Sequence, residues 1–146
     1  MTEVCFYDNA DDNLLKFAVI VSKYKDKFVF CKHIERDTYE IPGGRREEGE
    51  SIFETAKREL WEETGATEYT LKPVSVYSVI RNESADYDAE IFGMLYYADI
   101  KAFENLPDLE IEKIEFFENL PKNLTYPDIQ PRLMEKAIEA LNNKYI

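Results

Sequence analysis

The chain has 146 residues, of which 18 are Lys or Arg and 30 are Asp or Glu, so its formal net charge is −12 at pH 7. Such an acidic chain repels phosphate backbones and anionic lipids, which argues against charge-driven binding to nucleic-acid polymers or membranes. The 45% of hydrophobic and 14% of aromatic residues are typical of a folded protein. The length predicts one domain over residues 1–146.

The cysteines and the first residues indicate the compartment. Cys5 and Cys31 are too few for a disulfide framework and lack the CxxC spacing of a metal site. The first residues, MTEVCFYDNADDN, are polar and acidic, unlike a secretory signal. No apolar run approaches the roughly 20 residues of a membrane span. We therefore expect a soluble, cytoplasmic protein.

The first part of the chain has the pattern of short strands. Apolar and β-branched runs predict strands over residues 14–22, 27–31 and 39–41. Residues 24–26 form the turn between the first two strands, and the third strand ends at Pro42. Gly43 and Gly44 then open a charged loop.

Residues 51–64 form the best-defined predicted helix. Its apolar face consists of Ile52, Phe53, Ala56 and Leu60. Ser51 and Glu54 have the spacing of a capping box, and Gly65 stands where a left-handed cap ends a helix.

The second part of the chain alternates strands and a final helix. Residues 70–81 and 90–99 predict a hairpin whose loop is the polar stretch 82–88. Residues 111–117 alternate apolar and charged side chains, which predicts a half-buried strand, and residues 130–142 have helical spacing. A sheet with helices on its faces, an α/β fold, is therefore expected.

Three glutamates crowd one face of the first helix. Glu62 and Glu63 follow Glu59 by three and four residues, which places their Cβ atoms about 5–6 Å from that of Glu59. They lie near the negative end of the helix dipole, which disfavours each by about 0.3–1 kcal/mol. Such carboxylates can hold a hard divalent cation. Alternatively, they form a solvated acidic face in which Glu62 pairs with Arg58; spacing alone leaves both interpretations open.

The stretch from Gly43 to Ala66 carries a longer pattern, GGRREEGESIFETAKRELWEETGA. Its fixed positions are Gly44, Glu50, Arg58, Glu59, Leu60, Glu62, Glu63, Gly65 and Ala66. Over 23 residues this pattern resembles the signature of Nudix hydrolases at every fixed position. The order of strands and helices also resembles that family's α/β/α sandwich, with a mixed β-sheet between helices.

The resemblance implies hydrolysis of a nucleoside diphosphate linked to a moiety X, with Mg²⁺ or Mn²⁺ as cofactor. It implies as metal ligands Glu59, Glu62, Glu63 and the backbone carbonyl of Gly43. Arg58 would orient the glutamates, and Glu59 is the candidate general base. The glycines would allow the main chain to approach the metal closely.

Family members commonly add a carboxylate from a loop before the strand that precedes the last helix. Glu110 is our first candidate for this further metal ligand and Glu112 the second. Both residues could instead be ordinary outward-facing residues of the strand.

Other residues are candidates for substrate binding. Lys32, His33 and Arg36 lead into the signature, where a cation could contact phosphates, although they could also be surface residues. The loop before the last helix offers Asp128 and Gln130 where guanine-binding members often have an asparagine. We expect His33, Arg36, Gly44 and Gln130 to bind substrate. Tyr24, Tyr77 and Phe92 are nominal base-stacking candidates, since most aromatic residues must fill the core.

The chain resembles the small family members that remove oxidised purine nucleoside triphosphates such as 8-oxo-dGTP. The alternative is a pyrophosphatase of ADP-ribose, another nucleotide sugar or a dinucleotide, but the proline that some of these carry beyond the signature is absent between Pro73 and Pro107. A third possibility is a non-catalytic nucleotide-binding module, in which the signature glutamates are usually lost. The expected partner is a small nucleotide, bound by a monomer or a homodimer.

Overall fold

The computed structural model describes residues 2–81, 89–144 and 146. Its elements in chain order are β1 (Thr2–Tyr7), the short 3₁₀ helix η1 (Asp12–Leu14), β2 (Leu15–Tyr24), β3 (Lys27–His33), β4 (Tyr39–Glu40), β5 (Gly43–Arg45), α1 (Ile52–Thr64), β6 (Ala66–Arg81), β7 (Ala89–Phe103), β8 (Ile111–Phe117) and α2 (Gln130–Asn142). None of the described helices is long and apolar enough to cross a membrane.

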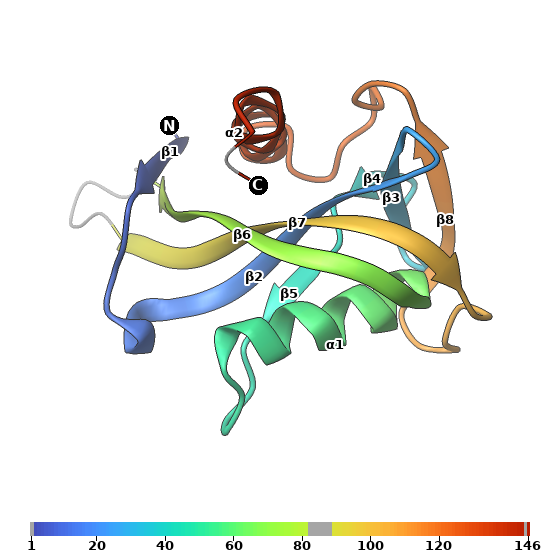
Figure 1. Cartoon of the computed structure of the whole chain (residues 1–146), viewed down its shortest axis with the longest axis horizontal. Coiled ribbons are helices and arrows are strands. Elements are labelled where there is room, and N and C mark those ends of the chain that lie inside the picture. Colours follow the sequence, from blue (N-terminus) through green and yellow to red (C-terminus); the bar gives the residue numbers. More distant parts are fainter. Residues whose placement is uncertain (1, 82–88, 145) are drawn as a thin grey trace.

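The strands form one mixed sheet (Figure 1). The strand order is β1-β6-β7-β2-β3-β4, with β5 paired to β2 and β8 paired to β3. β2 and β7 run parallel, whereas the other paired strands run antiparallel. On one side, β2 pairs with β5 near its start and with β3 at its end. Two different strands therefore follow β2 on that side of the sheet.

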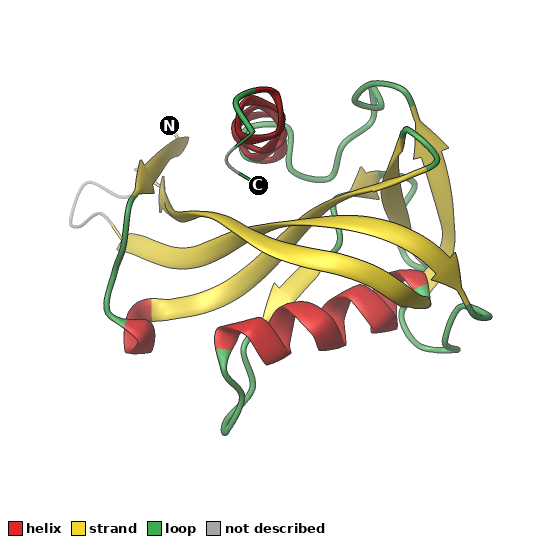
Figure 2. Cartoon of the chain, viewed as in Figure 1, coloured by secondary structure: helices red, strands yellow, loops and turns green. Residues whose placement is uncertain are grey.

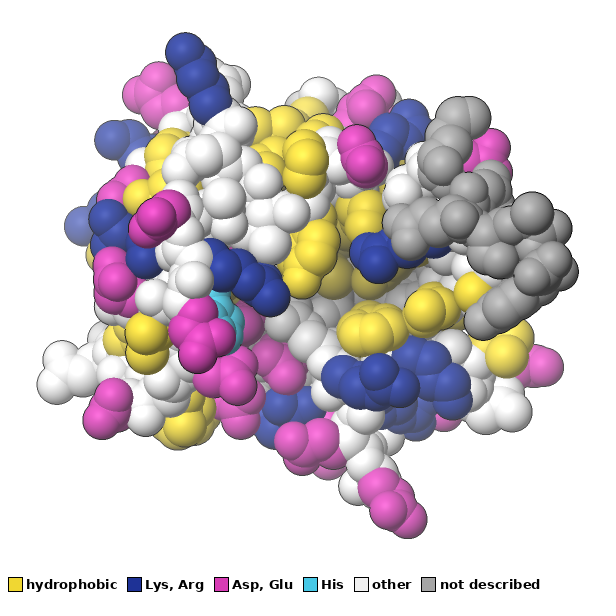
Figure 3. Space-filling view, turned by 180° about the vertical axis from the view of Figure 1, so that it is seen from behind, with side chains coloured by type: hydrophobic (Ala, Val, Ile, Leu, Met, Phe, Trp, Pro, Cys, Tyr) yellow, Lys and Arg dark blue, Asp and Glu magenta, His cyan; other side chains and the backbone are white. Residues whose placement is uncertain are grey.

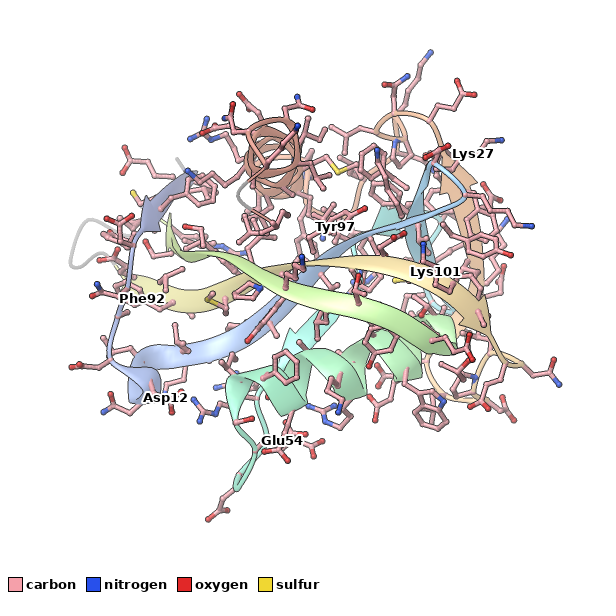
Figure 4. All side chains as sticks on the ribbon, viewed as in Figure 1. Asp12, Lys27, Glu54, Phe92, Tyr97 and Lys101 are labelled. Atoms are coloured by element: carbon pink, nitrogen blue, oxygen red, sulfur yellow. The ribbon has the colours of Figure 1, made fainter. Side chains whose placement is uncertain are left out.

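The two helices cover opposite faces of this sheet (Figure 2). Successive side chains of β2 alternate between the faces: Ala18 and Ile20 pack in the core beneath α1, whereas Val21 packs in the core beneath α2. In β7, Tyr96 lies on the α1 side and Tyr97, labelled in Figure 4, on the α2 side. The predicted α/β/α sandwich is therefore confirmed.

Elements with strong local signals have the predicted bounds. The strand over residues 111–117 and the helix over residues 130–142 match β8 and α2. The helix over residues 51–64 is confirmed as α1, with Ser51 as its N-cap. The turn after β2 is also confirmed, and its two central residues, Lys25 and Asp26, have left-handed φ angles of 49° and 66°.

The predicted hairpin over residues 70–81 and 90–99 is confirmed as the antiparallel pair β6–β7. Both strands are longer than predicted, because β6 begins at Ala66 and β7 runs to Phe103. The predicted loop over residues 82–88 lies outside the described residues.

Two strands were not predicted. β1 pairs along its whole length with β6, although it lies within the polar and acidic stretch that begins the sequence. β5 corrects the expectation of a charged loop at Gly43 and Gly44, because it pairs with β2 at Val19 and Ala18. An added Cβ at Gly43 would lie 2.5 Å from the carbonyl oxygen of Ala18, so only glycine permits this close strand contact.

Candidate active site

Both ends of α1 are held by local contacts that the sequence predicted. The Ser51 hydroxyl accepts a hydrogen bond from the Glu54 N–H at 3.1 Å, and the Glu54 carboxylate accepts one from the Ser51 N–H at 2.9 Å. At the other end Gly65 has a left-handed φ of 78°, and its N–H donates to the Trp61 carbonyl. The last turns of α1 lie beside β5, because their carboxylates contact Gly43 and Gly44.

The guanidinium of Arg58 is the centre of a hydrogen-bond network. Its Nε and Nη2 donate to the two oxygens of Glu50 at 2.6 and 3.0 Å, which makes a bidentate pair. Nη1 donates to Glu59 at 2.8 Å and to Glu62 at 3.2 Å, and Nη2 also donates to the Arg45 carbonyl at 2.9 Å. The Glu62–Arg58 pair of the solvated-face alternative is thus present, but the Glu59 side chain is only 12% exposed and is not part of a solvated face.

Glu50 is stabilised as a carboxylate by this network. The hydrogen bonds from Arg58 lower the pKa of Glu50 from 4.5 to about 2, with further help from the Glu47 N–H and the Thr55 hydroxyl. Because the pKa in the folded state is below that of the unfolded chain, Glu50 stabilises the fold above pH 4.5, and this contribution disappears as the pH falls towards 2.

Replacing Glu50 by glutamine therefore has a pH-dependent effect on stability. We expect Glu50→Gln to lower the free energy of unfolding at neutral pH and the difference from wild type to shrink between about pH 4.5 and pH 2. Urea unfolding at several pH values measures this, with Glu68→Gln, an exposed position on β6, as the control for loss of a surface charge. A difference that stays constant with pH would contradict the ion pair.

Glu63 and Glu59 lie against the backbone of β5. The Gly43 N–H donates to Glu63 Oε1 at 2.7 Å. Burial raises the pKa of Glu63 to about 8 despite this hydrogen bond, and it also raises the pKa of Glu59 against the opposing effect of Arg58. An added Cβ at Gly44 would lie 2.3 Å from the Glu59 carboxylate, so a glycine is required where the helix carboxylate meets the strand.

An acidic cavity of about 420 Å³ contains these carboxylates. Its lining consists of Arg45, Arg46, Glu47, Arg58, Glu59, Glu62, Glu63, Leu109, Glu110 and Ile111. Glu110 reaches it from the loop before β8, with its side chain 81% exposed and Oε2 3.5 Å from His33 Nε2. Glu112 is not among the lining residues and pairs instead with Lys32 at 3.1 Å. The structure thus brings Glu110, and not Glu112, to the cavity.

The acidic cavity has the donors that a hard divalent cation requires. In residues 2–81, 89–144 and 146, no group of three or more His, Cys, Asp or Glu side chains is gathered around one point for an ion. Arg58 donates to one oxygen of Glu59 and one of Glu62, and the Gly43 N–H donates to one oxygen of Glu63. The other oxygen of each carboxylate accepts no hydrogen bond from a described residue. Carboxylate oxygens are the ligands that Mg²⁺ and Mn²⁺ prefer. The residues therefore fit such an ion by their chemistry.

A second, mostly apolar cavity of about 400 Å³ adjoins the acidic one. Its lining consists of Phe17, Val19, Glu40, Ile41, Gly43, Gly44, Tyr77, Val79, Arg81, Ala89, Ile91, Tyr126, Ile129, Gln130 and Leu133. Gly43 and Gly44 line this cavity while contacting Glu63 and Glu59, so β5 separates the two cavities. Figure 3 shows this face: hydrophobic side chains line a hollow, and acidic ones gather around the single histidine at its side.

Two of the predicted substrate residues, Gly44 and Gln130, line the apolar cavity. Arg36 is held by Glu40 and by the Tyr126 hydroxyl, with Nη1 3.1 and 3.5 Å from their oxygens, so it lies beside this cavity and not beside the glutamates of α1. His33 contacts Glu110, which lines the acidic cavity, but His33 itself is not a lining residue.

Of the three aromatic candidates, only Tyr77 lines the cavity. Tyr24 packs against Phe103 and belongs to the core beneath α1. Phe92, labelled in Figure 4, belongs to the same core and contacts Tyr7.

Several residues that line the apolar cavity had no signal in the sequence. Glu40, Tyr126, Phe17 and Leu133 come from four separate parts of the chain, and no spacing relates them. Glu50 had a signal, because it is a fixed position of the signature, but its pairing with Arg58 follows only from the loop between β5 and α1.

Comparison with known proteins identifies the family of the chain. Residues 13–120 match the family described as the NUDIX domain. The chain therefore belongs to the Nudix hydrolases, a pyrophosphohydrolase family whose members use divalent metal ions and act on small nucleotides.

Individual relatives are similar over most of their length. A Bacillus subtilis protein named as a candidate 8-oxo-dGTP diphosphatase, YtkD, is 32% identical over 124 residues, which are 84% of this chain and 75% of that protein. The structure of a B. subtilis pyrophosphohydrolase, BsRppH, matches with a TM-score of 0.76 and 28% identity over 95% of this chain and 90% of that one. An ADP-ribose pyrophosphatase from Streptococcus suis has the same fold, with a TM-score of 0.63 and 16% identity over 86% and 90%.

Proposed function

We propose that this Nudix hydrolase cleaves a phosphoanhydride bond of a nucleoside triphosphate such as 8-oxo-dGTP, working as a single domain with Mg²⁺ or Mn²⁺. The observation that carries the proposal is the pair of adjoining cavities. The apolar cavity is suited to a flat nucleobase, and the acidic cavity is suited to a cation that neutralises phosphates. Gly43 and Gly44 between them let a nucleotide span both.

In this proposal each side chain at the acidic cavity has a role. The cation would be held by Glu59, Glu62, Glu63, Glu110 and the Gly43 carbonyl. When bound, it neutralises the phosphate oxygens and makes water more acidic. Arg58 orients Glu59 and Glu62 through its hydrogen bonds, and Glu59 accepts the proton of the attacking water.

The polar groups near the apolar cavity support a purine substrate. Gln130 is only 5% exposed and is fixed by the Ile41 N–H at 3.0 Å, so its amide is ordered before a base arrives. In the same proposal His33, which contacts Glu110, would bind a phosphate of the substrate. The relative named for 8-oxo-dGTP supports the same substrate class.

A substrate panel tests this proposal. The purified protein with Mg²⁺ is given 8-oxo-dGTP, dGTP, other nucleoside triphosphates, ADP-ribose, NADH and a dinucleoside polyphosphate, and products are identified by chromatography. We expect the highest kcat/KM for a purine nucleoside triphosphate, with a nucleoside monophosphate and pyrophosphate as products. A kcat/KM for ADP-ribose above that of every triphosphate would favour the nucleotide-sugar alternative.

Metal removal provides a second prediction. Because the carboxylates of the acidic cavity repel phosphates, excess EDTA should abolish hydrolysis and weaken nucleotide affinity on the order of 100-fold, since each close like-charge contact costs roughly 1 kcal/mol or more. Calorimetry with and without Mg²⁺ measures the affinity, and an excess of Mg²⁺ over EDTA should restore both properties. Tight nucleotide binding in EDTA would contradict the role of the glutamates.

A further inference from the structure

The apolar cavity contains one acidic side chain among the described residues that line it, Glu40. This residue ends β4, and its side chain is only 13% exposed. Glu40 Oε2 accepts a hydrogen bond from Arg36 Nη1 at 3.1 Å, whereas no described residue donates to Oε1. A carboxylate placed among apolar walls loses hydration, so hydrogen-bond donors on a ligand would stabilise it.

The Gln130 amide adds a donor to the same cavity. The Ile41 N–H can only donate, so the atom at 3.0 Å from it must be the carbonyl oxygen of the Gln130 side chain. This assignment leaves the NH₂ group for a ligand, and no described residue accepts from it. Ile41 follows Glu40 directly, so Gln130 is hydrogen-bonded to the backbone next to the carboxylate. The cavity thus combines a fixed acceptor with a fixed donor.

We infer that Glu40 and Gln130 read the Watson–Crick edge of a guanine-type base. Glu40 accepts from the N1–H and the 2-amino group, and Gln130 donates to O6. Adenine instead presents a lone pair at N1, which would face the Glu40 carboxylate with no donor between them. Its 6-amino group would face the NH₂ group of Gln130, so two donors would oppose each other. This inference rests on the proposed function and names the base that its substrate carries. Guanine and 8-oxoguanine share this edge.

Arg36 acts as a positioning residue for this recognition. Its guanidinium holds Glu40 Oε2 and contacts the Tyr126 hydroxyl, while its own side chain is 42% exposed. It therefore fixes the carboxylate from outside the cavity and does not touch the base.

The decisive comparison is between GTP and ITP, because hypoxanthine keeps N1–H and O6 but lacks the 2-amino group. We expect wild-type kcat/KM to favour GTP over ITP by about 10–100-fold, the range for a charge-assisted hydrogen bond. In Glu40→Gln this ratio should fall to about 1–3, because the bidentate acceptor is lost. The control Glu139→Gln, on the exposed side of α2, should keep the wild-type ratio.

Further measurements separate this inference from the proposed function. Calorimetric binding of GMP, IMP and AMP needs no hydrolysis, so preference for GMP in a protein that cleaves no triphosphate would support the base recognition and overturn the function. If the protein cleaved GTP, ITP and ATP at rates within about threefold of one another, the guanine recognition would be overturned and the proposed hydrolysis would stand. An equal effect of Glu40→Gln on dGTP and 8-oxo-dGTP is expected from their shared edge, and an effect on one only would contradict the assigned edge.

A second variant covers a failure of Glu40→Gln to fold. Arg36→Gln alters an exposed side chain and should lower the GTP to ITP ratio at least threefold or so by releasing the carboxylate. Arg36→Lys should recover part of the ratio, because it keeps a cation beside Glu40. An unchanged ratio in Arg36→Gln, together with an unchanged GMP to IMP affinity ratio, would refute the inference.

Discussion

At saturating Mg²⁺, Glu59→Gln is expected to lower kcat by about 10²–10⁴-fold, the range for loss of a general acid or base, with little change in the KM for nucleotide. Glutamine has the same shape as glutamate but cannot accept a proton and carries no charge. Glu59 is the carboxylate that lies 2.8 Å from Arg58 and against Gly44, with its side chain 12% exposed. Its position is therefore retained in the variant while its chemistry is lost.

Stability measurements distinguish this chemical effect from unfolding. Because glutamine still accepts the hydrogen bond from Arg58 and relieves repulsion from Glu62, the Tm of Glu59→Gln should stay close to that of wild type. Glu68→Gln, exposed on β6, is the matched substitution and should retain full activity. A kcat within about tenfold of wild type would show that another group accepts the proton.

Arg58→Met is expected to have the largest effect on stability. The variant keeps the aliphatic stem but leaves Glu50, Glu59 and Glu62 without their common donor, in places where two of these side chains are 16% and 12% exposed. Removing one partner of such a network should lower the free energy of unfolding by about 3 kcal/mol, which corresponds to a Tm decrease of roughly 6–12 °C. Activity should fall as well, since the glutamates lose their orientation.

Lys57→Met is the matched control for this variant. Lys57 is the preceding residue of α1, but it is exposed and its ammonium lies over the Phe53 ring instead of among carboxylates. Its replacement should leave the Tm and kcat close to wild type. If Arg58→Met were no less stable than Lys57→Met in thermal unfolding, the network would contribute nothing to the fold.

The fold was predictable where local signals decide the structure. α1 has a capping box and a left-handed glycine at its ends, and α2 and β8 have clear hydrophobic periods, so their bounds follow from neighbouring residues. β1 and β5 lack such signals. β1 becomes a strand because β6 offers it an edge, and β5 does so because Gly43 permits contact with β2. Strand pairing depends on a distant partner, which periodicity does not reveal.

The sequence by itself determined which carboxylates share a face, because Glu59, Glu62 and Glu63 lie on one helix, where spacing alone sets their neighbours. It also determined the family through the signature. Only the tertiary structure decided that Glu110 joins them, and that Glu40 and Gln130 meet in an apolar cavity across β5. These residues lie about 50 to 90 positions from their neighbours in space, and sheet pairing and helix packing bring them together.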